Sequence, residues 1–393
     1  MRILFFLLPS CGVAQQSFLV VDSVMSDAMS SGNWKAVNTF GKMALHQDMD
    51  YPMLRMRMGY AYMMRGNYSA SAVQYHNALK QDGYNMEARQ GIYEAEKILL
   101  RDDAAAWQAN ELYDSIQHSI GWKSSVPVTR VDLSGSYIKP GVSERSSAEY
   151  FMGGVGSRIA GKVSLYNAIS YFKQDYYSQQ LDSSQPHPPW LPPPPPRVIK
   201  VSTPIRMFQY YFRAGIQWSG SDNFWIAQDL VLDGSAKELL CAGFTHYFSN
   251  VTLEADGGYG WFGVDHSAQT DLRFKYYPFG NTTCYLFGQL SYLKYDSVAN
   301  SVTSGGIGFT FAKKVALEIS GSNGVNRFYF EDKGLYLYNI PDKNKERLTC
   351  TAWLPLGKHT WLDLTYRWEN DLQSMTNSEY KQNSITGGIL WKQ

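Results

Sequence analysis

The 393-residue sequence has no excess of either charge sign and, beyond its first residues, no long hydrophobic run. Its 36 Lys and Arg residues nearly balance its 35 Asp and Glu residues, giving a net charge of +1. Proteins that bind nucleic acids displace counterions with a basic surface, so this balance argues against nucleic acid as a partner. A transmembrane helix needs about 20 consecutive apolar residues, and none follow the N-terminus. The sequence therefore predicts neither a nucleic-acid-binding protein nor a helical membrane protein.

Cysteine and histidine are also scarce, with four and seven residues in the whole chain. Beyond the N-terminal residues, Cys241, Cys284 and Cys350 lie far apart and are odd in number, so the sequence implies no disulfide framework. The histidines are scattered and lack the short spacings of zinc ligands. We therefore expect no metal site and no cofactor.

The N-terminus has the pattern of a secretory signal peptide. Arg2 precedes the apolar stretch 3–8, and the small residues of 12–14 precede Gln15. This pattern predicts a signal peptide over residues 1–14. Residues 8–11 (LPSC) also resemble a bacterial lipobox, so lipidation of Cys11 is the alternative.

Residues 18–120 have helical periodicity and a repeat of about 34 residues. Gly32 and Trp34 correspond to Gly66 and Tyr68 one repeat later. The clearest copy, residues 54–84, resembles the tetratricopeptide repeat. Small and aromatic residues stand where the two helices of such a repeat meet: Gly59, Tyr62, Gly66, Tyr68, Ser71, Tyr75 and Ala78. The resemblance implies a short α-solenoid that binds a partner protein, and a plain spacer is the alternative.

From residue 128 to the end the pattern changes to alternation with a period of two. Leu364 and Tyr366, for example, share one strand face, while Asp363 and Arg367 share the other. Aromatic residues make up 15% of the chain although its mean hydropathy is −0.32, as expected when only every second residue faces lipid. A soluble β-sandwich alternates too, but aromatics near strand ends and alternately short and long turns favour an outer-membrane barrel.

The turns set the expected strand number. Short turns at 247–250, 278–281, 311–314 and 355–358 are expected in the periplasm. Longer connections at 141–147, 174–203, 296–301, 324–346 and 371–380 are expected outside the cell. Counting strands between these turns predicts about 14, with 12 to 16 also compatible. The aromatic Trp391 near the C-terminus resembles the signal by which bacterial barrels are recognised for assembly.

The domain order and residues 274–281 (FKYYPFGN) resemble outer-membrane proteins of Bacteroidota that join tetratricopeptide repeats to a YaiO-like barrel. That family has no established activity to imply. A more distant likeness is to exopolysaccharide export porins, which also place such repeats before a barrel.

Charged residues on the inward face of the alternating strands predict a polar lumen, with both signs interspersed. They are Arg213, Asp229, Glu254, Asp256, Asp271, Arg273, Lys275, Glu318, Asp363, Arg367 and Glu369. Such charges either pair across a narrow interior and fill it or form a selective pore, and the mixed signs favour a constricted interior.

No constellation of catalytic residues emerges. His246 and Ser249 are three positions apart on one strand and turn, so they face opposite sides, unlike the pair of a barrel phospholipase. Asp265 and His266 are an ordinary turn composition. The run 186–197 (PHPPWLPPPPPR) predicts a stiff surface loop of polyproline conformation, with a binding motif around Trp190 as the alternative.

The sequence thus predicts an α + β multidomain protein. A signal peptide (1–14) precedes a periplasmic tetratricopeptide-repeat domain (18–120) and an outer-membrane β-barrel (128–393). The expected function is non-enzymatic passage or export of a solute or polysaccharide across the outer membrane lipid bilayer. The repeats would recruit a periplasmic or inner-membrane protein. A plugged barrel that anchors a protein-interaction scaffold is the first alternative, and an outer-membrane enzyme the second.

Overall fold

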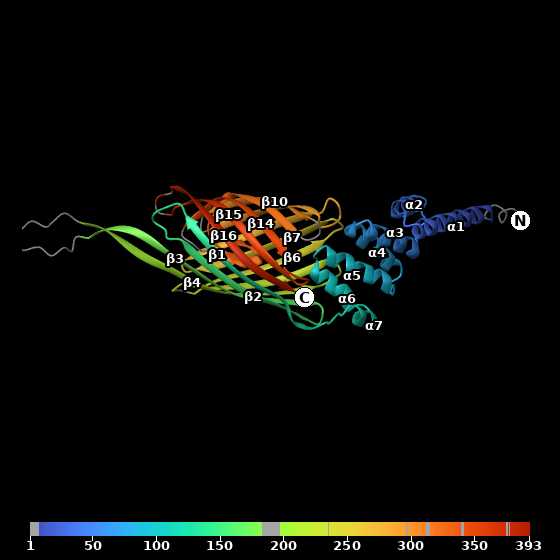
Figure 1. Ribbon diagram of the computed structural model, residues 1–393, viewed down its shortest axis with the longest axis horizontal. Helices are drawn as coiled ribbons and strands as arrows, with labels where there is room; N and C mark the ends of the chain where they lie inside the picture. Colours follow the sequence, from blue (N-terminus) through green and yellow to red (C-terminus); the bar gives the residue numbers. More distant parts are fainter. Residues whose placement is uncertain are drawn as a thin grey trace, which may run out of the picture.

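The computed structural model describes residues 8–182, 197–234, 236–295, 298–311, 315–338, 342–374, 376 and 378–393. A helical N-terminal region leads into a closed antiparallel β-barrel, which confirms the predicted fold class (Figure 1). The first half of the predicted signal peptide and nearly all of the proline-rich run lie outside the described residues.

The helical region repeats its geometry every 34 residues. Its helices are α1 (Leu8–Ser30), α2 (Trp34–His46), α3 (Pro52–Met64), α4 (Tyr68–Gln81), α5 (Met86–Ile98), α6 (Asp102–Asn110) and α7 (Asp114–Ser119). The starts of α2, α4 and α6 are 34 residues apart (68 − 34 and 102 − 68). Two positions before each start, Gly32, Gly66 and Leu100 all have positive φ angles of 68°, 72° and 61°. Within the described residues, no helix is both long and apolar enough to cross a membrane.

The expected repeat positions lie where neighbouring helices meet. A Cβ atom added at Gly59 would come within 2.9 Å of the Tyr75 ring, and one at Gly91 within 2.4 Å of the same ring. The Ser71 hydroxyl donates a hydrogen bond of 2.8 Å to the Gly59 carbonyl. Tyr62 and Ala78 are buried, whereas Gly66 and Tyr68 form the turn into α4. Glycine at 59 and 91 is therefore required by the ring that fills the space between α3, α4 and α5.

Fourteen strands close the barrel in the described part of the chain, the number the turns predict. They are β1 (Val126–Pro140), β2 (Ala148–Ile159), β3 (Val163–Asp182), β4 (Arg197–Gln217), β5 (Asp222–Leu232), β6 (Ala236–Tyr247), β7 (Val251–Phe262), β8 (Asp265–Tyr276), β9 (Cys284–Tyr295), β10 (Val298–Phe311), β11 (Val315–Asn326), β14 (Lys343–Pro355), β15 (Thr360–Leu372) and β16 (Glu379–Lys392). Sequential strands pair with each other, β11 pairs with β14, and β1 pairs with β16 to close the ring.

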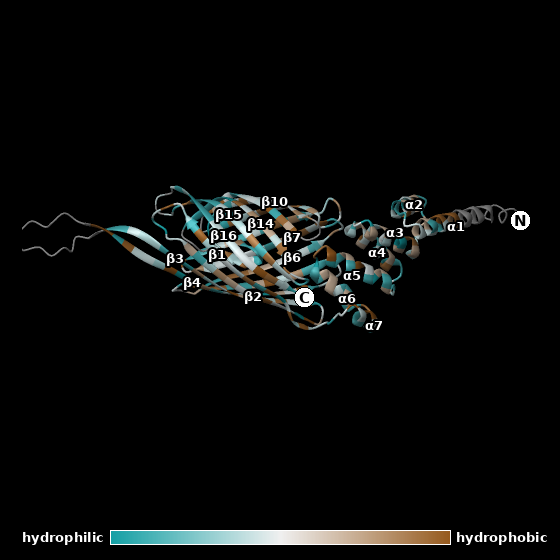
Figure 2. Cartoon of the chain, viewed as in Figure 1, coloured by the Kyte–Doolittle hydropathy of each residue, from teal (hydrophilic) through white to brown (hydrophobic). Residues whose placement is uncertain are grey.

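The outer face of the barrel is apolar. Hydrophobic and hydrophilic residues alternate along its strands (Figure 2). Large apolar side chains stay exposed there, among them Leu133 at 58%, Ile226 at 61% and Leu272 at 56%. Exposed aromatic residues stand near both ends, including Trp218, Phe248 and Phe279 at one end and Tyr137, Tyr259 and Tyr292 toward the other. A barrel surface with an apolar band between aromatic girdles is what lipid-facing strands require.

Two predicted loops differ in the structure. The prediction of a loop over 174–203 was wrong for residues 174–182 and 197–203, because β3 and β4 continue past the barrel wall and pair with each other as far as Asp182 and Arg197. This two-stranded ribbon projects from the end opposite the helices (Figure 1). The prediction of an external connection over 324–346 was wrong for residues 327–338, which fold back into the barrel and form the small hairpin of β12 (Phe330–Glu331), η1 (Asp332–Gly334) and β13 (Tyr336–Leu337).

Candidate functional site: the barrel interior

Residues 327–338, here called the inner segment, cross the interior of the barrel. The Tyr211 hydroxyl of β4 donates a hydrogen bond of 3.0 Å to the carbonyl of Lys333. On β8, the Gln269 side chain bonds to both the N–H and the carbonyl of Phe330, at 3.1 and 2.9 Å. From β14, Arg347 reaches Glu331. Since these strands lie on different sides of the ring, the inner segment must lie within it.

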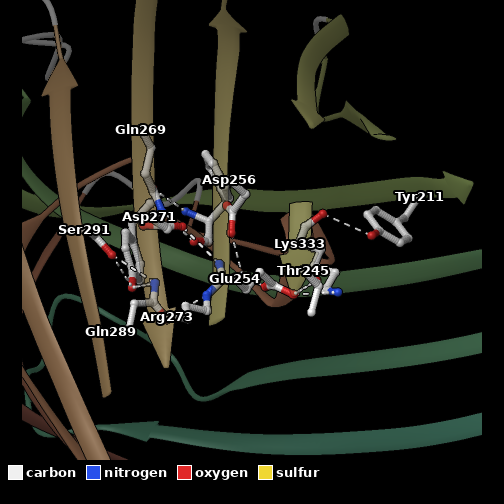
Figure 3. A network of polar contacts seen from close by, with 12 residues as sticks. Tyr211, Thr245, Glu254, Asp256, Gln269, Asp271, Arg273, Gln289, Ser291 and Lys333 are labelled. Atoms are coloured by element: carbon white, nitrogen blue, oxygen red, sulfur yellow. Dashed lines mark hydrogen bonds and ion pairs between the residues drawn. The ribbon is translucent and has the colours of Figure 1, made fainter. Parts of the chain in front are cut away.

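A charged cluster on β7 and β8 holds one side of the inner segment. Arg273 forms ion pairs with Glu254, with Asp256 at 2.8 Å and with Asp271 at 3.0 Å. Lys333 of the inner segment joins the cluster through Glu254 at 2.7 Å (Figure 3). The cluster therefore has three carboxylates and two cations, and the second cation comes from the inner segment itself. Removing one member of such a buried network leaves its partners uncompensated.

A second ionic contact holds the other side. Arg347 donates two hydrogen bonds to Glu331, of 2.7 and 2.8 Å, and one of 3.1 Å to Glu369. The Arg347 side chain is only 6% exposed. Next to it, Arg367 donates a hydrogen bond of 2.8 Å to the Tyr338 hydroxyl. The inner segment is thus fixed to β7, β14 and β15 by charged groups and to β8 by the Gln269 amide.

Apolar side chains of the inner segment pack against part of the wall formed by strands β2 to β6. Phe330 and Leu335 pack in one buried cluster with Tyr211, Trp225 and Cys241. A Cβ atom added at Gly334 would lie 3.1 Å from the Cys241 sulfur. Burial of large side chains is the main favourable term in folding, so this packing holds the inner segment against the wall.

Next to this packing the interior contains a cavity of about 340 Å³. Its wall comes from β1 to β5 and β14 to β16, and residues 332 and 335–338 of the inner segment complete it. The lining combines hydroxyls and amides, such as Ser136, Gln209 and Ser384, with charged side chains and with apolar ones such as Met152 and Val231. This space is large enough for several waters or a small solute.

The structure groups the eleven residues expected in the lumen into several contacts. Glu254, Asp256, Asp271 and Arg273 form the charged cluster, while Asp363, Arg367 and Glu369 line the cavity. Asp229 is buried and accepts a hydrogen bond of 2.6 Å from Gln209. Lys275 lies 3.8 Å from the Tyr285 ring centroid, and the Tyr285 hydroxyl donates a hydrogen bond to Glu318. Arg213 lies 5.7 Å from the centroid of the Tyr166 ring.

Sequence reasoning missed several interior residues. Glu331 and Lys333 fall in the connection expected to be external, so their charges had no assigned face. Arg347 and Arg130 lie on strands whose alternation does reveal their inward face: Arg347 shares its face with Thr349 and Thr351, which line the cavity. That signal was available for Arg347 and was overlooked.

The helical region contacts the turns at one end of the barrel. Ser69 donates its backbone N–H to the carbonyl of Gly280 at 3.0 Å, and the Asn281 amide bonds to the Gly66 carbonyl at 2.8 Å. Lys392, near the C-terminus, forms an ion pair of 2.7 Å with Asp102. These contacts join the helices to the short β8–β9 turn and to the last strand, so the helices cover part of that opening.

Arg101 is the central buried group of this contact. It is 4% exposed, pairs with Glu96 at 3.2 Å and donates a hydrogen bond of 3.1 Å to the carbonyl of Ser249 in the β6–β7 turn. Its guanidinium also lies 5.2 Å from the Tyr247 ring centroid. Burial raises the pKa of Glu96 against the opposing effect of Arg101. Losing either partner would leave the other as an isolated buried charge.

His76 is a second group at this contact. A Cβ atom added at Gly220, in the β4–β5 turn, would lie 3.4 Å from its Cε1 atom. Burial, together with the nearby cations Lys80, Arg89 and Arg101, lowers the pKa of His76 to about 4. The imidazole is therefore neutral when the helices contact the barrel at neutral pH.

The catalytic pairings considered from the sequence are not assembled by the described residues. His246, considered with Ser249, instead bonds to Asp222 at 2.6 Å; the same carboxylate accepts a hydrogen bond from a different serine, Ser219. A nucleophile needs the base itself as its partner. His359 bonds instead to the Lys392 carbonyl at 2.9 Å. No group of three or more His, Cys, Asp or Glu residues in the described chain could hold a metal ion.

Comparison with known proteins gives structural neighbours only. No protein-family model matches the chain, and no curated protein matches its sequence. Among solved structures, a mutant of the monoaromatic hydrocarbon channel TodX is similar with a TM-score of 0.47 and 10% identity, covering 68% of this chain and 91% of that one. The outer membrane protein Omp33 of Acinetobacter baumannii has a TM-score of 0.39 and 7% identity, covering 68% and 99%. The porin KdgM in complex with disordered oligogalacturonate has a TM-score of 0.32 and 9% identity, covering 56% and 99%. Such low values carry no substrate or function to this chain.

Proposed function

We propose that this chain is a non-enzymatic outer-membrane barrel that passes a solute or polysaccharide, and that the inner segment limits the passage. The observation that supports it best is the cavity of about 340 Å³ beside the inner segment, whose lining includes hydroxyl, amide and charged side chains. A barrel that served only as an anchor would gain stability by filling this space with apolar side chains, as in the buried cluster of Phe330 with Trp225 and Cys241. In this proposal, the eleven charged residues expected on the inward strand faces line the lumen.

The lipid bilayer of the outer membrane is the proposed surroundings of the barrel. Exposed side chains such as Leu133, Ile226 and Leu272 would be unfavourable in water, where a contiguous apolar surface promotes aggregation. Only closed barrels and helices can span a bilayer, because every backbone polar group needs a partner there. The closed pairing of β1 with β16 supplies these partners. The export that this location requires is assigned to the signal peptide of residues 1–14.

In the same proposal, residues 18–120 form the periplasmic tetratricopeptide-repeat domain and residues 128–393 the barrel. The helices contact the short turns of the barrel, and this supports placing the helices and those turns on the periplasmic side. The helices also expose apolar side chains that the barrel does not cover, including Met43, Met53 and Tyr84 at 85% exposure. We assign to them the recruitment of a periplasmic or inner-membrane protein.

Single-channel recording in a planar bilayer tests the passage. The full-length protein and its Lys333→Met variant are compared, with Lys42→Met on the exposed face of α2 as the control for the loss of a lysine. We expect a small steady conductance in the wild type and in the control. The Lys333→Met variant should conduct more, because Glu254 loses its contact with the inner segment. Silence of all three proteins would contradict passage and favour the membrane-anchored scaffold.

Photo-crosslinking in cells tests the recruitment. A photoreactive amino acid replaces Tyr84 in one variant and the exposed Val264, in the β7–β8 turn at the opposite end of the barrel, in another. We expect a discrete protein adduct at position 84 whose partner is periplasmic or in the inner membrane. No adduct at 84, or the same adducts at both positions, would contradict recruitment by the helices.

A further inference from the structure

We propose that the cavity beside the inner segment selects small cations and cationic solutes over anions, and that Asp332 and Asp363 supply the selecting charge. This inference rests on the proposed passage of a solute and specifies the charge of what passes.

The charged residues of the cavity wall are unequal in sign. Arg130 and Arg367 oppose Asp132, Asp332, Asp363 and Glu369, which gives 2 − 4 = −2 for the lining. Mixed charges cancel only where they pair, so the pairing of each group decides the field that a solute meets.

Two of the four carboxylates are compensated. Asp132 pairs with Arg130 at 2.7 Å, and Glu369 pairs with Arg347 at 3.1 Å. Asp332 and Asp363, in contrast, form no ion pair with any described residue. Both lie within range of the Arg130 and Asp132 pair, since their charges interact with it. One side of the cavity therefore combines three carboxylates with a single guanidinium.

The inner segment itself separates its two adjacent charges. Lys333 turns away from the cavity to Glu254 at 2.7 Å, whereas Asp332 is exposed on the cavity side. The lysine therefore neutralises the cluster on β7 and not its neighbour. Arg367 is the remaining cation of the lining, and it donates to the Tyr338 hydroxyl at 2.8 Å. Among the unpaired groups, two negative charges face one positive charge.

The uncharged part of the wall suits the same class of solute. Hydroxyl and amide oxygens of Ser136, Gln209 and Thr365 can replace water around a cation. The faces of Tyr336 and Tyr150 attract cations through their ring quadrupoles. Anions can use the hydroxyl and amide donors and Arg367, but they also meet the two unpaired carboxylates of Asp332 and Asp363. Rings of one charge sign are a general device of ion selectivity.

Reversal potentials of the full-length protein test this inference. A planar bilayer separates concentrated from dilute KCl, and the wild type is compared with Asp332→Asn, Asp363→Asn and the double variant. Asp27→Asn is the matched control, because Asp27 is exposed on α1, far in sequence from the barrel. We expect a wild-type reversal potential of the sign of K⁺ permeation. Each cavity substitution should lower the permeability ratio of K⁺ to Cl⁻ by about threefold at ~0.1 M salt, where screening weakens but does not abolish such charges.

The outcomes separate the inference from the function it rests on. A steady conductance that is anion-selective or unselective in the wild type would overturn cation selectivity while leaving passage intact. So would a cation selectivity that both cavity substitutions leave unchanged. Absence of conductance from every variant would overturn the passage and, with it, this inference. A cation preference that falls in the cavity variants and not in Asp27→Asn supports both.

Discussion

Replacing Glu331 by Gln should loosen the inner segment while keeping the size of the side chain. Arg347 donates two hydrogen bonds to Glu331 and is almost fully buried. Hydrogen bonds to charged groups contribute about 1.5–3 kcal/mol each. Because Arg347 keeps Glu369 and the glutamine keeps one acceptor oxygen, we expect a net loss of about 1.5 kcal/mol. The population with a displaced inner segment should then rise about tenfold, since 1.4 kcal/mol is a factor of ten.

Cys241 offers a native probe of that displacement. Its side chain is 5% exposed and packs against Phe330 and Leu335 of the inner segment. In a background where Ser replaces the other three cysteines, a small maleimide can label only this thiol. When opening is fast compared with labelling, the rate follows the open population, so Glu331→Gln should label about tenfold faster.

The control for this experiment is Glu87→Gln, on the exposed start of α5, which should label at the wild-type rate. Denaturation should make Cys241 fully reactive in every protein. Equal labelling rates for Glu331→Gln and the wild type in the folded state would refute the view that the Arg347 contact holds the inner segment in place.

Further variants examine the membrane face, the helix packing and the contact between the helices and the barrel. Leu272→Arg, on the outer face of β8, should lower the free energy of unfolding in phospholipid vesicles by about 2–4 kcal/mol, as measured by denaturant titration. The control Val264→Arg, in the turn at the strand end, should lower it little. Equal losses in the two variants would argue against a lipid-facing band. Gly91→Ala places a methyl group against the Tyr75 ring and should lower the stability of the helical region by about 1–3 kcal/mol, as followed by thermal unfolding of the helical signal. The control Gly83→Ala meets nothing within 4 Å and should leave the stability unchanged. His76 has a folded pKa of about 4, below its ordinary value, so the unfolded state binds more protons between pH 6.5 and 4. The helical Tm should therefore fall as pH drops through this range, and the fall should be smaller in His76→Gln; identical pH profiles would contradict the assignment.

The barrel was predictable because its surroundings impose a simple rule on the sequence. A strand between lipid and lumen must alternate, so Leu364 and Arg367 report their faces directly. The same rule places most of the cavity wall, including Asp363 and Glu369. Strand number followed as well, since each short turn between alternating segments marks one strand pair.

The inner segment was not predictable, because nothing local determines where a connection folds. Its position depends on contacts with residues distant in sequence, such as Lys333 with Glu254 and Phe330 with Gln269. The ribbon of β3 and β4 was missed for another reason. Beyond the barrel wall it has no lipid-facing side, so residues 174–180 carry polar side chains on both faces, a pattern that predicts a loop.

A reversible disulfide between the inner segment and the wall tests the central claim most directly. A Cβ atom at position 334 lies 3.1 Å from the Cys241 sulfur, within reach of a disulfide for a Gly334→Cys variant. Gly334 has a φ angle of 91°, so any side chain there costs about 1–3 kcal/mol, and Gly334→Ser controls for this strain. If the inner segment limits passage, conductance in a planar bilayer should be lowest with the disulfide formed and should rise on reduction, without a response in Gly334→Ser. Equal conductance in the oxidised and reduced protein would contradict a passage controlled by the inner segment.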